Sequence, residues 1–232
     1  MRSVLLPSGE VHDTNGTECQ KEEGARVRTL EERTSQSERL GRHPSISRAE
    51  LSHIGLKLFI EFGFDETTVE DIAAAAGIGR RTFFRYFPSK NDLPWGDFED
   101  LLEQMRVLLA SLPEDLPIIE AIRIAVVDFN RVPPEEIPFH RQRMELLLTV
   151  PSLMAHSALR YIAWRQVVAE YVAYRLDTPV ESLEPQTIAW TFLGLSLSAY
   201  EQWLKNVDSN LLELMDSAFN MLNNAFTHET LL

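Results

Sequence analysis

The sequence predicts an all-α protein, and three features of its pattern support that prediction. From Ile46 onward, apolar residues recur at the three- and four-residue spacing of helices. No segment shows the two-residue alternation typical of a half-buried strand. Prolines stand near the starts of several apolar segments, where a helix tolerates them because its first amides lack partners. We expect about nine helices in two blocks.

The first block contains three predicted helices. The first covers residues 47–62 and ends at Gly63, a residue that commonly terminates helices. Thr67 and Glu70 fit a capping box that starts a second, short helix, which ends at Ala76. The segment 77–79, Gly-Ile-Gly, permits a tight turn before a third helix. That third helix covers residues 80–87.

Longer helices follow in the second block. We expect one that starts at residues 89–92, restarts after Pro94 and extends to residue 112. The remaining predicted helices cover residues 117–131, 138–150, 151–176, 181–205 and 208–226.

Composition narrows the class of protein. The chain has 232 residues, 44% hydrophobic and 25% charged, which is enough for one large core or two small ones. No apolar run approaches the ~20 residues of a membrane span, and the N-terminus lacks a signal-peptide core. We therefore expect a cytoplasmic protein. Cys19 is the only cysteine, so a disulfide framework or a multi-thiolate metal site within the chain is excluded.

Charge is unevenly distributed along the chain. The net charge of −13 argues against a surface that binds nucleic acid everywhere. Residues 39–90 nevertheless carry +2, whereas residues 1–38 carry −3 and residues 91–232 carry −12. A small basic segment is thus attached to an acidic one. Such an arrangement should suppress non-specific binding to DNA and make any affinity strongly salt-dependent.

We divide the chain into three parts. Residues 1–44 have few large apolar side chains and are expected to form a mobile arm, with Arg39 and Arg42 next to the first helix, where they could reach a minor groove or the DNA backbone. Residues 45–92 form the predicted helix-turn-helix DNA-binding domain. Residues 93–228 form the predicted ligand-binding and dimerisation domain.

A short helix, a glycine-containing turn and a second short helix match the helix-turn-helix plan, in which the second helix enters the DNA major groove. At about 100° per residue, Phe83 and Phe87 share the inner face of the third helix, and Arg81 and Arg85 point nearly the opposite way. Guanidinium groups can bond guanine bidentately or pair with phosphates. The alternative interpretation is a merely solvated basic helix face.

Residues 67–93 resemble the DNA-binding domain of TetR-family regulators. The resemblance implies that Arg80, Arg81 and Thr82 approach base edges, and that phosphates are held by Thr67 or Thr68, Tyr86 and Lys90. Two positions depart from the family pattern. Phe84 lacks the hydroxyl of the usual tyrosine, which suggests contact with a thymine methyl. Gly79 replaces the usual capping serine or threonine, so the helix starts more loosely.

Weaker resemblance extends over residues 40–226. It is carried by residues 95–98, 150–157, 159–165 and 199–204, which are similar to the TetR-family subgroup associated with mycofactocin gene clusters in actinobacteria. That subgroup is associated with long-chain acyl-CoA effectors. The resemblance therefore implies such an effector here, although no spacing in the sequence shows an acyl-CoA site.

The second block contains candidates for a ligand site. Aromatic and sulfur-containing side chains could line a pocket between helices, and packing of the bundle core is the alternative. These candidates are Trp95, Phe98, Phe129, Met144, Tyr161 and Trp164. Four arginines, Arg141, Arg143, Arg160 and Arg165, could meet coenzyme A phosphates or pair with surface carboxylates; we select Arg160 and Arg165 as ligand-binding candidates.

The last two helices present more apolar surface than a terminal pair can bury alone. We therefore predict a four-helix dimer interface, whose two-fold symmetry matches a palindromic operator. The predicted interface residues are Leu193, Leu197, Tyr200, Leu204, Leu211, Met215, Phe219 and Leu222.

No enzyme motif is present. The sequence lacks Gly-x-Ser-x-Gly, His-Glu-x-x-His and a P-loop, and its six histidines show no ligand spacing. We expect no cofactor, no metal and no catalytic residues. The prediction is a homodimeric DNA-binding repressor controlled by a small apolar or amphipathic effector. The alternative is a helical ligand-binding or carrier protein that does not act on DNA.

Overall fold

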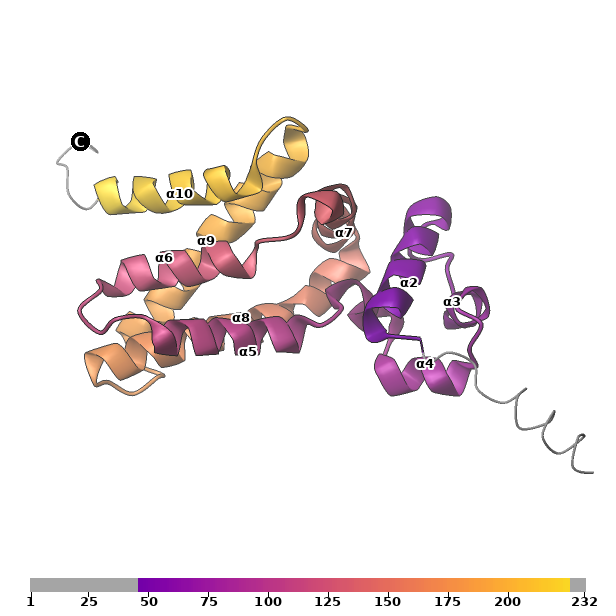
Figure 1. Ribbon diagram of the computed structural model, residues 1–232, viewed down its shortest axis with the longest axis horizontal. Coiled ribbons are helices and arrows are strands. Elements are labelled where there is room, and N and C mark those ends of the chain that lie inside the picture. Colours follow the sequence, from indigo (N-terminus) through magenta and orange to yellow (C-terminus); the bar gives the residue numbers. More distant parts are fainter. Residues whose placement is uncertain (1–45, 226–232) are drawn as a thin grey trace, which may run out of the picture. The chain divides into compact units, whose positions relative to one another are not determined.

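A computed structural model of the chain describes residues 46–225. Nine α-helices and two 3₁₀ segments make up this part of the chain, and it contains no strand, which confirms the all-α prediction (Figure 1). The helices are α2 (Arg48–Phe62), α3 (Val69–Ala75), α4 (Arg80–Tyr86), α5 (Phe98–Ser111), α6 (Ile118–Phe129), α7 (Ile137–Thr149), α8 (Pro151–Leu176), α9 (Leu183–Lys205) and α10 (Leu211–Ala225). The 3₁₀ segments are η1 (Lys90–Trp95) and η2 (Pro134–Glu136). Arg39 and Arg42 lie outside the described residues.

Helices α2, α3 and α4 enclose a small apolar core. Its fully buried members come from all three helices and from the residue after α4. They are Leu51, Leu56, Phe59, Ile72, Phe83 and Phe87. Ser47 and Glu50 form a capping box at the start of α2, because each side chain bonds a backbone amide of the other.

The second capping box lies one residue later than predicted. Thr68, not Thr67, is the N-cap of α3, and its side chain accepts from the amide of Asp71 at 3.2 Å. Thr67 is buried, and its hydroxyl donates to the carbonyl of Gly63 at 2.7 Å. The predicted phosphate contact by Thr67 is therefore wrong, since this hydroxyl faces the interior and is already used.

The turn between α3 and α4 is formed as the glycines suggest. Gly77 has φ +65°, a left-handed conformation that favours glycine. Gly79 is the N-cap of α4, and no side chain caps this helix. The recognition helix therefore starts without the hydrogen bond that serine or threonine would supply.

The predicted fourth helix is split in two. Segment η1 ends at Trp95, and Gly96, at φ +53°, separates it from α5. Segment η1 packs against α2, where the hydroxyl of Ser52 donates to the carbonyl of Leu93 at 2.8 Å. Gly55 of α2 permits this close approach, because a Cβ there would lie 2.4 Å from Cδ1 of Leu93.

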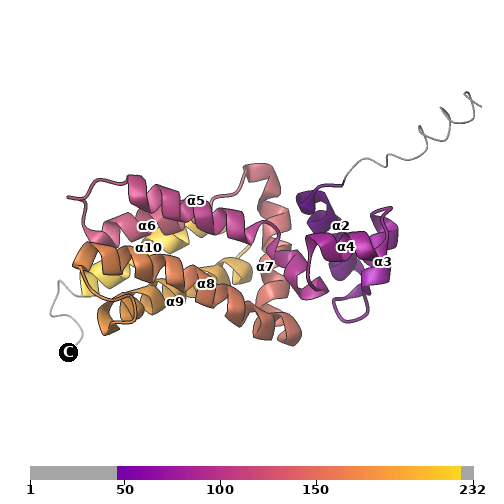
Figure 2. The same ribbon diagram turned by 90° about the horizontal axis from the view of Figure 1, so that it is seen from below.

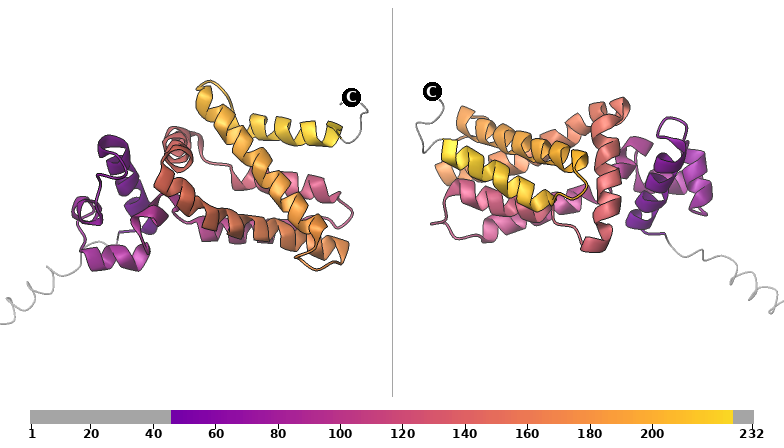
Figure 3. Two further views of the ribbon diagram at one scale, coloured as in Figure 1. Left: turned by 180° about the vertical axis from the view of Figure 1, so that it is seen from behind. Right: turned by 90° about the horizontal axis from the view of Figure 1, so that it is seen from above.

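Helices α5 to α10 form a helical bundle that contains the long helix α8. Helix α8 packs against α9, α7 and α5, helix α5 packs on α6, and α10 lies against α9 and α6 (Figures 2 and 3). Helix α7 runs across the end of this bundle next to α2, and His53 stacks on Phe139 there with ring centroids 4.0 Å apart. No single helix among the described residues is long and apolar enough to cross a membrane; residues 134–149 and 151–176 meet that test only as a pair bent by 98°.

Most residues predicted for a dimer interface lie inside this chain instead. They are Leu193, Tyr200, Leu211, Met215 and Phe219, all buried. The prediction is wrong for them because the apolar stripes of α9 and α10 pack on each other and on α8 and α6. Leu197, Leu204 and Leu222 are only partly exposed. The exposed apolar side chains of these helices are instead Leu183, Trp190 and Met221, at 77%, 56% and 70% exposure.

The close contact between Gly55 and Leu93 predicts that a side chain at residue 55 destabilises the fold. Gly55→Ala should lower the free energy of unfolding by ~1–3 kcal/mol, because the added methyl overlaps a fully buried leucine. Urea unfolding measures this loss. In a Leu93→Ala background the same change should cost much less, since the cavity receives the methyl. Additive effects of the two changes would contradict the packing described here.

Candidate nucleic-acid interface and internal cavity

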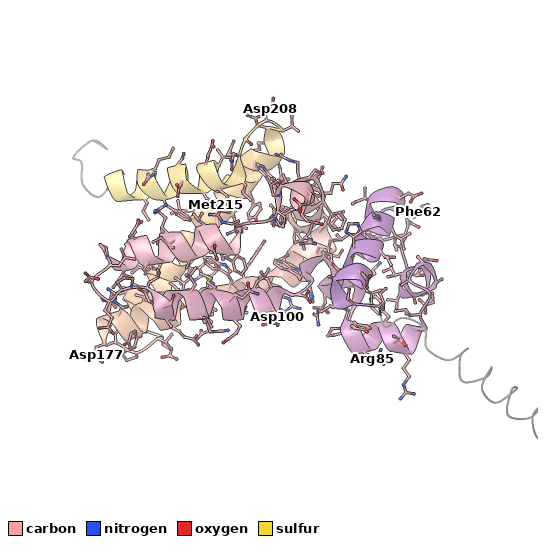
Figure 4. The ribbon with its side chains drawn as sticks, in the orientation of Figure 1. Phe62, Arg85, Asp100, Asp177, Asp208 and Met215 are labelled. Carbon is pink, nitrogen blue, oxygen red and sulfur yellow. The ribbon has the colours of Figure 1, made fainter. Side chains whose placement is uncertain are left out.

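The exposed face of α4 carries arginines. Phe83 and Phe87 are fully buried beneath it, while Arg81 and Arg85 are exposed. Figure 4 shows Arg85 projecting from α4 away from the neighbouring helices. Phe84 is 42% exposed beside them. The face therefore has the form that helical spacing predicts, two cations and an aromatic ring over an apolar anchor, and its contact with DNA stays a prediction.

Arg80 starts the same helix but is paired within the protein. Its Nη1 bonds Oε1 of Glu70 in α3, and its guanidinium lies 5.5 Å from the centroid of the Phe84 ring. Both charged side chains are more than half exposed. An exposed pair of this kind contributes only ~0–1 kcal/mol, so a phosphate or base can replace the carboxylate.

Lys90 is engaged within the chain, and its predicted phosphate contact stays a prediction. Its Nζ donates to the backbone carbonyls of Phe64 at 2.8 Å and Thr67 at 3.0 Å, and it lies 4.4 Å from the Phe64 ring centroid. These contacts use the ammonium to hold the loop between α2 and α3. Thr68 is exposed but its hydroxyl is used in the α3 capping box, while Thr82 and Tyr86 are half-buried on α4.

A buried carboxylate joins the segment after α4 to helix α8. Oδ1 of Asp92 accepts from Nε2 of His156 at 2.8 Å and from Nη2 of Arg160 at 2.7 Å. Oδ2 accepts from the amide and hydroxyl of Ser89. Burial by itself raises the pKa of Asp92, but the hydrogen bonds from Ser89, His156 and Arg160 outweigh it and lower the pKa.

This cluster changes the role of Arg160. Its second Nη bonds Glu99 at 2.6 Å, so both ends of the guanidinium are occupied by carboxylates of the same chain. The predicted ligand contact by Arg160 is therefore wrong. Arg165 does not meet a ligand site either, because its guanidinium lies 3.6 Å from the centroid of the Trp190 ring and it is not in the cavity wall.

A cavity of about 140 Å³, partly open to solvent, lies among η1 and helices α5 to α9. All six apolar and aromatic ligand candidates lie in its wall: Trp95, Phe98, Phe129, Met144, Tyr161 and Trp164. Leu193, Leu197 and Tyr200, predicted for the dimer interface, line it as well. The structure thus brings these residues to one cavity, and ligand binding by them stays a prediction.

The sequence analysis missed most of the polar wall. His140, Arg143, Asn130 and Ser196 line the cavity, and only Arg143 was noted, as one of four arginines with two possible roles. The spacing of residues in α7 could have predicted part of this wall. His140, Arg143, Met144 and Leu147 are spaced three, four and seven residues apart, which places them on one helix face.

A chain of hydrogen bonds fixes the protonation of this wall. Nδ2 of Asn130 donates to the carbonyl of Val126 at 2.7 Å, so its Oδ1 accepts the hydroxyl proton of Tyr200, also at 2.7 Å. The Tyr200 oxygen must then accept from Nε2 of His140 at 2.9 Å. Burial, aided by the charge of Arg143, lowers the pKa of His140 to about 4. His140 is therefore neutral, with Nδ1 as a bare acceptor.

A more open groove of about 740 Å³ adjoins the cavity. It shares Asn130, Arg131, Val132 and His140 with the cavity wall, and η2 and the start of α10 form its other sides. The cavity and the groove therefore share part of their walls.

Two protein-family models match the chain. Residues 54–93 match the model for bacterial regulatory proteins of the tetR family, and residues 116–227 match the MftR C-terminal domain. A Mycobacterium tuberculosis protein named as the mycofactocin biosynthesis transcriptional regulator MftR is 42% identical over 184 residues, which cover 79% of this chain and 93% of that protein.

Solved structures share the fold at low identity. FadR of Thermus thermophilus, described as a TetR-family repressor in complex with lauroyl-CoA, has a TM-score of 0.50 and 21% identity over 76% of this chain and 93% of its own. The fatty acid degradation regulator FadR of Bacillus halodurans has a TM-score of 0.58 and 14% identity over 81% and 99%. The relatives are transcriptional regulators, and the sequence prediction of a regulator rather than an enzyme is confirmed.

The Asp92 cluster generates a second stability prediction. Asp92→Asn should cost ~3–5 kcal/mol of unfolding free energy, because Arg160 and His156 lose the carboxylate that they share in a buried site. Since the folded-state pKa of Asp92 is lowered, its contribution is present above the unfolded pKa of about 4 and is lost as the pH falls through the folded value.

Chemical denaturation of both proteins between pH 7 and pH 3 measures this effect. The difference between wild type and Asp92→Asn should shrink toward the acid end. The exposed Asp128→Asn variant, whose carboxylate lies 3.8 Å from Arg131, is the matched control and should change stability by less than about 1 kcal/mol. Equal losses in the two variants would show that Asp92 does not hold this junction.

Proposed function

The chain belongs to the TetR family of bacterial transcriptional regulators, in the MftR subgroup, and we propose that it is a dimeric repressor whose hold on a palindromic operator is released by a small apolar or amphipathic effector. One observation carries the proposal. Helices α2 to α4, which carry the exposed arginine face, are called the reader below. The short segment η1 packs on α2 of the reader and also lines the apolar cavity. In this proposal residues 45–92 are the DNA-binding domain and residues 93–228 the effector and dimerisation domain.

The α4 face suits a major groove. Arg81 and Arg85 have no carboxylate partner among the described residues, so both are available to guanine edges or phosphates. Thr82 and Phe84 flank them on the same helix and would contact neighbouring bases, while Tyr86 and Thr68 would meet the DNA backbone. The acidic remainder of the chain repels the duplex elsewhere and confines contact to this surface.

Coupling to an effector would run through η1. Trp95 and Pro94 belong to the cavity wall, and Leu93 next to them packs on α2. A ligand that pushes Trp95 outward would therefore move the segment on which the reader rests. Such a ligand shifts the equilibrium only by the amount that it binds the displaced conformation better.

A long-chain acyl-CoA is the effector that we carry forward from the sequence. The apolar wall of the cavity supports an acyl chain, the adjoining groove gives room for a larger head group, and the Thermus FadR was solved with lauroyl-CoA. The cavity of about 140 Å³ is smaller than the ~300–1,000 Å³ of typical ligand sites. An acyl chain would thus have to separate the surrounding helices, which is the movement that release of DNA requires.

Dimerisation would use the exposed faces of α9 and α10. The residues buried in the chain's own core are not available, but Leu183, Trp190 and Met221 are, and Gly194 has no atom of another residue within 4 Å of a Cβ position. Two such helix pairs would form the four-helix contact predicted from the sequence. A two-fold dimer presents two α4 helices to two half-sites of a palindrome.

The DNA-binding proposal is tested by changing the α4 arginines. We expect Arg81→Ala combined with Arg85→Ala to weaken binding to a duplex selected by the wild-type protein from a random library by about 30-fold or more, since each lost bidentate contact costs ~1–3 kcal/mol. Fluorescence anisotropy measures the affinity, and circular dichroism checks the helices.

The matched control is Arg106→Ala, which removes an arginine from α5 that pairs with Glu103 and Glu170. It should bind the duplex as the wild type does. If no duplex is enriched, or if the double variant binds like the control, the chain acts as a ligand carrier and not on DNA.

The dimer proposal is tested at Trp190. Trp190→Asp places a carboxylate on the exposed face of α9 and should raise the dimer dissociation constant at least tenfold, whereas Val107→Asp, on the exposed face of α5, should not. Light scattering over a range of micromolar concentrations measures the oligomeric state. A wild-type monomer, or dissociation by Val107→Asp alone, would contradict the proposed interface.

A further inference from the structure

Arg143 is a half-buried cation that forms no ion pair among the described residues. It lies in the wall of the internal cavity, its Nε is buried with no hydrogen-bond acceptor, and among residues 46–222 it forms no ion pair. Its guanidinium lies 5.4 Å from the centroid of the Phe139 ring, a distance at which attraction to the ring is weak. A guanidinium stays charged in proteins, and burying one without a counter-charge is unfavourable. The buried Nε of Arg143 therefore has room for an acceptor that the chain itself does not supply.

The residues around Arg143 do not supply that group. His140 and Tyr200 are neutral members of the hydrogen-bonded chain that ends on Asn130. Ser196 donates its hydroxyl to the carbonyl of Phe192 at 2.8 Å. The carboxylates of Asp97 and Glu136 act on Arg143 from a distance only, and Asp97 is paired with Arg48 at 3.3 Å. Burial accordingly lowers the pKa of Arg143.

The three other arginines in this group are occupied. Arg141 donates to backbone carbonyls at the end of α9, including that of Val207 at 3.2 Å. Arg160 joins two carboxylates, and Arg165 lies against the ring of Trp190. Arg143 differs from all three because its charge faces a cavity.

A second unused donor lies in the same wall. Nε1 of Trp95 is buried without an acceptor, although buried indole N–H groups usually find one. Trp95 belongs to η1 and Arg143 to α7, so two elements direct unpaired donors at one cavity. The rest of the wall is apolar, with Leu101, Phe129 and Leu147 among its members.

We propose that this cavity binds a monocarboxylate with an apolar body, and that Arg143 holds the carboxylate with help from Trp95. A carboxylate offers one negative charge and two acceptor oxygens, which match one guanidinium and one indole. A phosphate dianion would leave one negative charge unbalanced beside a single guanidinium. A thioester carbonyl is uncharged and would leave Arg143 unpaired.

The inference rests on the proposed function, because it takes the cavity as the effector site, and it replaces the acyl-CoA named there by an effector with a free carboxylate. A free long-chain acid, rather than its coenzyme A thioester, is then the better ligand. Since Trp95 is part of η1, binding of the carboxylate would also pull on the segment that supports the reader.

The test compares three probes with one chain length: sodium dodecanoate, 1-dodecanol and dodecanoyl-CoA. Each is titrated into the full-length protein by calorimetry. We expect dodecanoate to bind at least tenfold tighter than dodecanol. Arg143→Met should abolish that preference, and Arg143→Lys should keep part of it. The control Arg131→Met removes an exposed cation from the mouth of the cavity and should leave the preference unchanged.

Thermal unfolding without ligand separates binding from a structural role. Arg143→Met should melt at the same temperature as the wild type or higher, because the change removes an unpaired, half-buried charge. A lower melting temperature together with unchanged discrimination between dodecanoate and dodecanol would overturn the proposal.

The outcomes also separate this inference from the proposed function. If dodecanoyl-CoA binds and releases the selected duplex while dodecanoate does not bind, the carboxylate inference fails and the effector-controlled repressor stands. If none of the probes binds, the inference fails, and the acyl-CoA effector proposal fails with it. Equal binding of dodecanoate by wild type and Arg143→Met overturns the inference by itself.

Discussion

The hydrogen bonds to Asp92 are the constraint on which the rest of the molecule depends. Its carboxylate is only 5% exposed, and both oxygens are used, one by Ser89 and the other by His156 and Arg160. A buried carboxylate is tolerated only when its acceptor sites are filled. The groups that fill them come from the segment after α4 and from helix α8, so a single buried charge links helices α2 to α4 to the bundle, beside the stacking of His53 on Phe139.

Segment η1, which contains Asp92, contacts both the reader and the bundle. Toward the reader, Leu93 sits against Gly55 so closely that any side chain at residue 55 would collide with it. Toward the bundle, Pro94 and Trp95 are part of the cavity wall. A close-packed interior does not deform gradually, so in the proposed function a change in what fills the cavity would be passed to α2 through this segment.

The helices could be predicted from the sequence because their signals are local. The bounds of α8 match the prediction, and the inner and outer faces of α4 follow from helical spacing. The cap of α3 could not be fixed in the same way, because Thr67 with Glu70 and Thr68 with Asp71 both fit a capping box. The choice depends on burial of Thr67 beneath α2, which is a tertiary contact.

The sequence predicts which residue types line the cavity, but it does not predict which residues contact one another there. An apolar stripe on α9 looks the same whether it faces its own bundle or a second subunit, and for that reason Leu193 and Tyr200 were assigned to the wrong surface. Likewise the sequence shows that Arg143 and Arg160 are cations but not which carboxylates reach them. Arg160 finds two of them because η1 and α5 start beside α8.

The arginines connect these points to function. The net charge of −13 describes the whole chain and says little about where anions bind, because most of the described arginines are paired with carboxylates or carbonyls of the chain. Arg81 and Arg85 on the surface, Arg143 in the cavity wall and Arg165 against the Trp190 ring have neither among the described residues. The outer two share a convex helix face open to a polyanion, and the inner one faces an apolar cavity with room for a single anionic group. The outer and the inner cations therefore indicate two different partners, and η1, like α7, both packs on α2 and lines that cavity.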